Sequence, residues 1–135
     1  MIAQVVYDTL HGKSEKVASK FNFEVSNCKN AILFADVVIF ICPTYGDEEL
    51  PHMMEDYLLS INSNPRYFVV CELGNYYGYD DFTFGAKKII ESYLINIGWK
   101  KFFKGLSLDS IPTIDWQIFF KWKEELEYAL QTNIE

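Results

Sequence analysis

The sequence VVIFICP, at residues 37–43, decides the fold class, because every position before its closing proline is apolar. A strand that is apolar on both faces is typical of a parallel sheet covered by helices on both sides. A second run of this kind, YFVVC, spans residues 67–71, and between the two runs Pro51 fits the first position of a helix. We therefore expect an α/β domain in which strands alternate with helices.

The same alternation is predicted along the rest of the chain. Hydrophobic positions repeat with helical spacing in several segments, and strand-like runs lie between them. Gly98 is expected to end one of these helices, and Asp115 to cap the start of the last one. This pattern predicts one three-layer domain over residues 1–135, with a parallel sheet between two layers of helices. The predicted strands span residues 2–7, 23–25, 37–42, 66–73 and 100–108, and the predicted helices span residues 15–21, 51–61, 86–97 and 116–130.

The composition argues against several classes of protein. With 12 Lys and Arg against 19 Asp and Glu, the net charge of −7 disfavours binding to nucleic-acid phosphates. The longest apolar run, residues 37–43, is too short to insert across a membrane, and no signal peptide is expected. Cys28, Cys42 and Cys71 lack metal-binding or redox spacing, so we expect no metal site. The predicted location is the cytoplasm. Cys42 and Cys71 end apolar strands, so we expect their side chains to be buried.

The net charge is concentrated in one part of the chain. Between Pro43 and Phe82 there are eight acidic residues and one basic residue, Arg66, while the remaining residues carry eleven of each sign. Such a distribution favours a surface that attracts positively charged partners, although charge that only keeps the protein soluble gives the same count.

Ligands of parallel α/β sheets bind outside the carboxyl ends of the strands. Three loops leave those ends here, at residues 8–14, 43–51 and 73–83. The first offers hydroxyl and backbone N–H groups that suit a phosphate, and it is equally consistent with an ordinary turn before a helix. The other two present tyrosines beside glycines, which suit a flat aromatic ring. Together the loops favour a ligand site over simple loop packing.

Three motifs in these loops resemble those of the flavodoxins, small FMN-binding electron carriers. The sequence TLHGKS, at residues 9–14, is similar to the flavodoxin phosphate loop Ser/Thr-x-Thr-Gly-x-Thr at its first, fourth and last positions. TYGD and ELP, within residues 44–51, resemble the Thr-Trp-Gly-Asp…Glu-Leu-Pro loop, and GNYYGY, at residues 74–79, resembles Gly-Asp-x-x-Gly-Tyr. The resemblance runs through the whole chain in order. It implies a compact, short-chain flavodoxin-like sandwich with five parallel strands in the order 2-1-3-4-5.

The resemblance also implies a role for each loop. The first loop would hold the FMN phosphate, Tyr45 and Tyr79 would stack on the two faces of the ring, and backbone groups of the second and third loops would bind the ring edge. Three residues depart from the flavodoxin pattern, namely His11, Lys13 and Asn75. The residues assigned to FMN in this way are Thr9, Leu10, His11, Gly12, Lys13, Ser14, Pro43, Thr44, Tyr45, Gly46, Leu73, Gly74, Asn75, Tyr77, Tyr79 and Phe82.

The resemblance implies a low-potential electron carrier without a substrate of its own. It would pass single electrons from a reductase, photosystem or oxidoreductase donor to acceptor enzymes. We expect a monomer that docks transiently with basic redox partners through five acidic residues, and that binds neither nucleic acid nor membrane. Alternatives are an activator of a radical metalloenzyme of the ribonucleotide reductase type, an FMN-dependent quinone reductase, and a flavin-free binding module. The five acidic residues are Asp47, Glu48, Glu49, Asp80 and Asp81.

Overall fold

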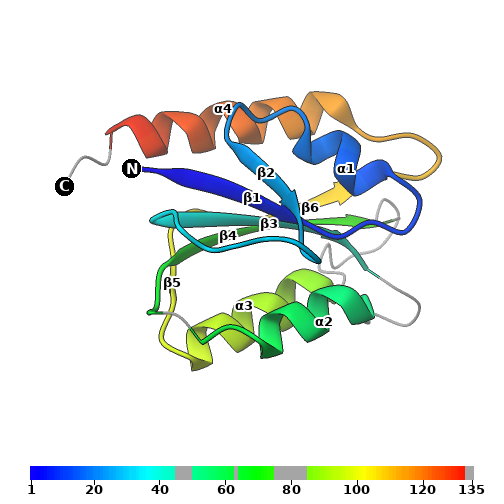
Figure 1. Ribbon diagram of the computed structural model, residues 1–135. Helices are drawn as coiled ribbons and strands as arrows, with labels where there is room; N and C mark the ends of the chain where they lie inside the picture. The colour runs from blue at the N-terminus through cyan, green and yellow to red at the C-terminus, as the bar shows by residue number, and fades with distance from the viewer. Residues whose placement is uncertain (45–49, 63, 75–84, 133–135) are drawn as a thin grey trace.

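The fold is a three-layer sandwich in which the sheet lies between two pairs of helices (Figure 1). The computed structural model describes residues 1–44, 50–62, 64–74 and 85–132. Helices α1 and α4 cover one face of the sheet, and α2 and α3 cover the other. The strands are β1 Ala3–Tyr7, β2 Glu24–Asn27, β3 Val37–Pro43, β4 Tyr67–Gly74, β5 Lys100–Lys101 and β6 Leu106–Asp109. The helices are α1 Lys13–Ala18, α2 His52–Leu59, α3 Ala86–Asn96 and α4 Trp116–Thr132.

The strand order is β2-β1-β3-β4-β5, and the strand pairs are parallel, which confirms the expected topology. Strand β3 lies at the centre, and its residues 37–42 are all fully buried. Ile39 and Ile41 pack in the cluster that faces α1 and α4, whereas Val38 and Phe40 pack in the cluster that faces α2 and α3. The continuous apolar run therefore supplies both cores of the sandwich, as its sequence predicts.

The last strand differs from its prediction because it is interrupted. The segment expected as one strand over residues 100–108 forms β5 and β6, and both pair with β4. Between them, the carbonyl oxygen of Lys104 accepts a hydrogen bond of 2.9 Å from the indole Nε1 of Trp122 on α4. Gly105 then passes so close to β4 that an added Cβ would lie 2.7 Å from the carbonyl oxygen of Val70. Bonding to α4 thus replaces strand pairing at this point.

The observed helix ends lie within a few residues of the predicted ones. Helix α1 begins at Lys13, earlier than expected, directly after Gly12. Pro51 stands just before α2 and not within it. Asp115 caps α4 as predicted, since its Oδ1 accepts the N–H of Ile118 at 3.3 Å. Gly98 has a φ of +100°, as a glycine that ends a helix commonly does. Among the described helices, none is long and apolar enough to cross a membrane.

The three cysteines are buried and free, which agrees with the expectation for Cys42 and Cys71. Burial is the largest cause of the raised pKa of each thiol, and it brings the pKa of Cys28 to about 12. Because the thiolate is the reactive form, these thiols should be inert in the folded protein.

We predict that no thiol of the native protein reacts with a disulfide reagent at about pH 8, and that all three react after unfolding in urea. As a control for reactivity, the exposed substitution Ser92→Cys should add one thiol that reacts without denaturant. Rapid reaction of a native cysteine would contradict the buried placement.

The raised thiol pKa values also predict a dependence of stability on pH. Above the ordinary thiol pKa of 9.0, the unfolded chain releases protons that the native protein keeps, so the free energy of unfolding should fall as the pH rises.

Candidate functional site

The carboxyl ends of β1, β3 and β4 meet at one edge of the sheet. Tyr7 lies beside Ile41, and Pro43 lies beside Leu73, in the strand register. Hydrogen bonds continue the pairing beyond the strands, from the Asp8 N–H to the Ile41 carbonyl at 3.0 Å and from the Thr44 N–H to the Leu73 carbonyl at 2.9 Å. The first, second and third loops therefore start side by side, as the parallel topology requires.

A pocket of about 300 Å³ lies at this edge. Nine of the residues assigned to FMN from the sequence line it, and two lining residues, Ser110 and Ile111, come from the segment after β6. Six other assigned residues lie outside the described part of the chain, namely Tyr45, Gly46, Asn75, Tyr77, Tyr79 and Phe82. The nine are Thr9, Leu10, His11, Lys13, Ser14, Pro43, Thr44, Leu73 and Gly74.

The first loop is shaped by its own side chains. The Gly12 N–H donates to the hydroxyl oxygen of Thr9 at 2.7 Å, and Gly12 has a φ of +89°, a conformation that glycine adopts without strain. Ser14 is buried, while His11 is exposed. The Thr-x-x-Gly spacing thus closes a turn in which Thr9 acts as a hydrogen-bond acceptor.

Asp8 is a buried carboxylate that the sequence motifs do not point to. Its two oxygens accept hydrogen bonds from the N–H of Thr9 at 2.8 Å and from the N–H of Met54 at 3.1 Å. Burial raises the pKa of Asp8, and these two backbone hydrogen bonds oppose the shift. Because Met54 lies in the first turn of α2, the carboxylate joins the end of β1 to the start of that helix.

Glu72 has a matching role on β4 and is fully buried. Its Oε1 accepts the N–H of Lys87 at 2.9 Å and the N–H of Gly85 at 3.3 Å, both at the start of α3. The hydroxyl of Thr44 lies 3.4 Å from the same oxygen, and the hydroxyl of Ser107 on β6 donates to Oε2. The only sequence signal for this residue is a single acid within an otherwise apolar strand, and the signal does not reveal its partners.

Lys13, assigned to FMN as part of the first loop, lines the pocket and also contacts the chain after β6. Its Nζ donates to the carbonyl oxygens of Ser110 and Pro112, the latter at 3.5 Å. Ser110 is also held by β4, because its N–H donates to the Gly74 carbonyl at 2.8 Å. The segment after β6 forms a fourth wall that the three sequence motifs do not predict, although it also follows the carboxyl end of a strand.

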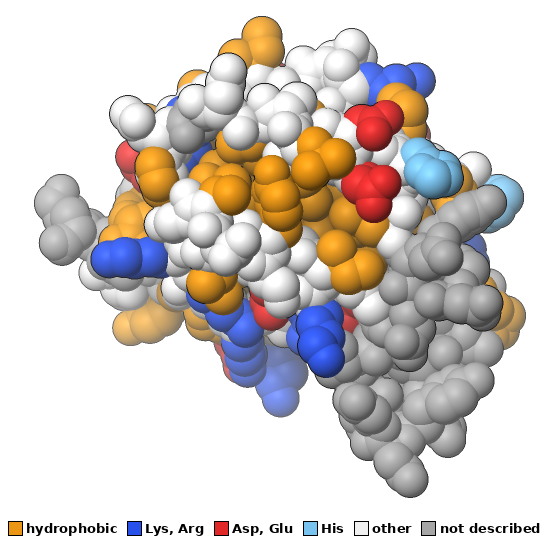
Figure 2. All heavy atoms as spheres, turned by 90° about the horizontal axis from the view of Figure 1, so that it is seen from below, with side chains coloured by type: hydrophobic (Ala, Val, Ile, Leu, Met, Phe, Trp, Pro, Cys, Tyr) orange, Lys and Arg blue, Asp and Glu red, His pale blue; other side chains and the backbone are white. Residues whose placement is uncertain are grey.

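The described acidic residues between Pro43 and Phe82 occupy two different places. Glu55 and Asp56 are exposed on α2, and Glu72 is buried. The face formed by α2 and α3 also exposes several apolar side chains (Figure 2), including Leu59 and Ile95. The acids predicted to attract partners, Asp47, Glu48, Glu49, Asp80 and Asp81, lie outside the described residues.

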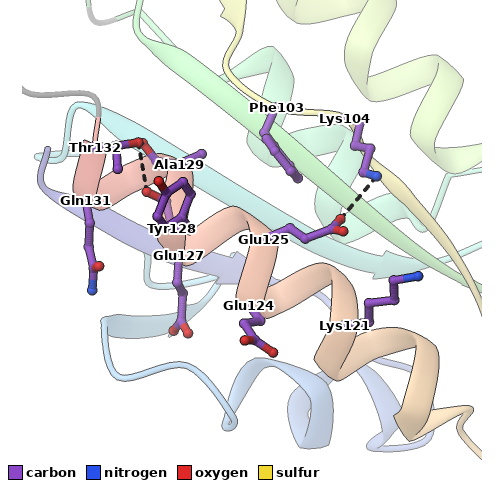
Figure 3. A pocket seen from close by; sticks show the side chains of 10 residues that line it. All are labelled: Phe103, Lys104, Lys121, Glu124, Glu125, Glu127, Tyr128, Ala129, Gln131 and Thr132. Atoms are coloured by element: carbon purple, nitrogen blue, oxygen red, sulfur yellow. Dashed lines mark hydrogen bonds and ion pairs between the residues drawn. The ribbon is translucent and has the colours of Figure 1, made fainter.

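A second hollow lies beside α4 and contains none of the assigned residues (Figure 3). Charged side chains of both signs line it, and Lys104 and Glu125 form an exposed ion pair of 3.1 Å. Such a pair contributes at most about 1 kcal/mol to stability.

In the parts of the chain that the structure describes, no group of His, Cys, Asp and Glu could hold a metal ion. The candidate site is therefore the pocket at the sheet edge.

We predict that Glu72→Ala lowers the free energy of unfolding by about 3 kcal/mol, because buried N–H and hydroxyl donors would lose their acceptor. Glu72→Gln keeps one carbonyl oxygen for the α3 N–H groups and should cost about 1 kcal/mol. Urea titration measures both values. The exposed Glu124→Ala, on α4, is the control and should change stability by no more than about 0.5 kcal/mol. An equal effect of Glu72→Ala and the control would show that Glu72 does not hold the edge together.

Comparison with known proteins finds similar structures but no matching sequence family. No family model and no curated protein sequence matches this chain. A flavodoxin of Streptococcus pneumonia TIGR4 is 25% identical over 78% of this chain and 83% of its own, with a TM-score of 0.63. Oxidised flavodoxin 1 from Bacillus cereus is 16% identical over 99% of this chain and 100% of its own, with a TM-score of 0.74.

A third similar structure is the Fusobacterium nucleatum flavodoxin bound to flavin mononucleotide. It is 18% identical over 74% of this chain and 68% of its own, with a TM-score of 0.60. These structures share the parallel sheet and the helix layers described above, and they agree with the resemblance that the three sequence motifs indicate. The chain therefore has the flavodoxin fold, and its three loop motifs resemble those of the flavodoxins.

Proposed function

We propose that this chain binds FMN in the pocket at the carboxyl edge of the sheet and serves as an electron carrier. The observation that carries the proposal is that residues from all three motif-bearing loops line one pocket, although the motifs are about thirty residues apart. The flavodoxins with the same fold, one of them bound to flavin mononucleotide, support the choice of ligand.

The residues that line the pocket fit this cofactor. Hydroxyl groups of Thr9, Ser14 and Thr44 stand together with apolar side chains such as Leu10 and Leu73. A ligand with a polar phosphate chain and a flat apolar ring needs both kinds of surface. Bound FMN would supply reversible uptake of electrons, and the protein supplies binding, orientation and electrostatics.

Each of the three loops has a proposed part in this binding. The loop of residues 9–14 would hold the phosphate through hydroxyl and backbone N–H groups. Backbone groups of Thr44 and Gly74, at the ends of the two central strands, would orient the ring edge. On the basis of the motifs, Tyr45 and Tyr79 would stack on the ring.

The charges near the pocket favour a low reduction potential. Asp8 and Glu72 are buried acids beside the residues that line it, and the sequence between Pro43 and Phe82 carries a net charge of −7. Negative charge opposes the addition of an electron nearby, and it does so more strongly where water is excluded. We therefore propose a carrier that gives electrons readily.

Titration with FMN tests the proposal. We expect the flavin fluorescence to be quenched on binding, and the complex to be bleached and restored by reduction and reoxidation. Thr9→Val removes the acceptor for the Gly12 N–H and should raise the FMN Kd about tenfold, whereas Thr132→Val at the end of α4 should leave it unchanged. A protein that binds no FMN would overturn the proposal and favour the flavin-free binding module.

We also propose that acidic residues of the second and third loops steer basic redox partners to the site. Attraction over long distances speeds docking and still allows rapid release, which suits a carrier. The support is the charge count, because the excess of acids lies in the sequence between Pro43 and Phe82 and the rest of the chain is balanced.

Electron transfer from the reduced, FMN-loaded protein to a basic c-type cytochrome measures this steering. The rate should fall as salt is added, because ions screen exposed charges. Asp80→Asn with Asp81→Asn removes two of the proposed steering charges. The double variant should therefore transfer electrons several-fold more slowly at low salt, and its rate should depend less on salt. Glu124→Gln with Glu125→Gln, on α4, is the matched control. A rate in the unmodified protein that does not depend on salt would contradict steering.

A further inference from the structure

We propose that Lys13 is a positioning residue that fastens residues 110–112 to the phosphate loop and thereby completes a fourth wall of the pocket. On this view, its ammonium group does not bind the ligand's phosphate. The inference rests on the proposed function in one respect, namely that FMN is the ligand of the pocket.

The contacts of the ammonium group are the first argument. Lys13 is partly buried, and its Nζ donates to the carbonyl oxygens of Ser110 and Pro112. An ammonium group has three N–H donors and no acceptor, so two of the three are directed at this segment. The partners lie almost a hundred positions from Lys13 in the sequence, and the contact joins α1 to the turn before α4.

The way in which the segment is held is the second argument. On one side, the Ser110 N–H donates to the Gly74 carbonyl of β4 at 2.8 Å. On the other side, the Ser110 carbonyl accepts from Lys13. Ile111 follows directly and lines the pocket, although it is 56% exposed. An apolar side chain with so much exposure has little core packing to hold it, so its place depends on the fastening of its neighbour.

The competing role for Lys13 is direct contact with the phosphate, because lysine is a common phosphate ligand. The two roles differ in their effect on riboflavin, which has the same ring and sugar chain as FMN but no phosphate. Loss of a phosphate contact weakens FMN binding alone. Loss of a wall weakens the binding of both flavins by a similar factor.

The first experiment therefore measures the Kd of FMN and of riboflavin by quenching of flavin fluorescence. Lys13→Met should raise both values about tenfold. Lys13→Arg should recover most of the affinity, because a guanidinium group also offers several N–H donors to carbonyl oxygens. The exposed Lys16→Met, on the same helix, should change neither value. A rise for FMN with no rise for riboflavin, or no change for either, would overturn the proposal.

The second measurement uses the protein without flavin and so separates this inference from the proposed function. Hydrogen–deuterium exchange of the backbone over residues 109–115 should be faster in Lys13→Met than in the unmodified protein, and unchanged in Lys16→Met. Equal exchange in the unmodified protein and Lys13→Met would overturn the fastening role. If the unmodified protein binds neither flavin while exchange rises in Lys13→Met, the fastening role stands and the FMN proposal fails.

Discussion

Two buried carboxylates, Asp8 and Glu72, connect the carboxyl edge of the sheet to the helices of one layer. A carboxylate is costly to bury unless hydrogen bonds replace its water, and both of these accept backbone N–H groups. Asp8 accepts from α2 and Glu72 from α3, and those are the helices that follow the second and third loops. Each anchored helix begins where a candidate ligand loop must end. The loops therefore start at β3 and β4 and finish at points fixed to the same edge.

Glu72 also explains how an interrupted strand can support the site. The chain leaves β4 between β5 and β6, yet β6 returns in a register that places Ser107 beside Glu72. The Ser107 hydroxyl then donates to the Glu72 carboxylate. Asp109 and Ser110 follow at the level of Gly74, where Ser110 reaches the pocket. The fourth wall is thus positioned by β4, the same strand that carries the third loop.

The sequence predicts the parts of this structure that depend on repeating patterns. The apolar runs of β3 and β4, the helical spacing of α3 and α4 and the Asp115 cap are local signals, and each agrees with the structure. The functions of Asp8, Glu72 and Lys13 depend on contacts between distant segments. Glu72 looks like one strand residue among others, because its partners Thr44, Gly85, Lys87 and Ser107 lie on other elements. Lys13 looks like a phosphate ligand for the same reason.

The placement of Lys13 bears on how a phosphate could be recognised in so acidic a protein. Between Pro43 and Phe82 there is one basic residue against eight acids, and the second and third loops contain no Lys or Arg. If the Lys13 ammonium is engaged by backbone carbonyls, recognition falls to neutral donors such as the Ser14 hydroxyl and the backbone N–H groups of residues 9–14. Hydrogen bonds from fixed neutral donors depend on geometry more than on charge, and salt screens them less than an exposed ion pair. The shape of the first loop, closed by Thr9 and Gly12, then matters more to phosphate binding than the positive charge within it.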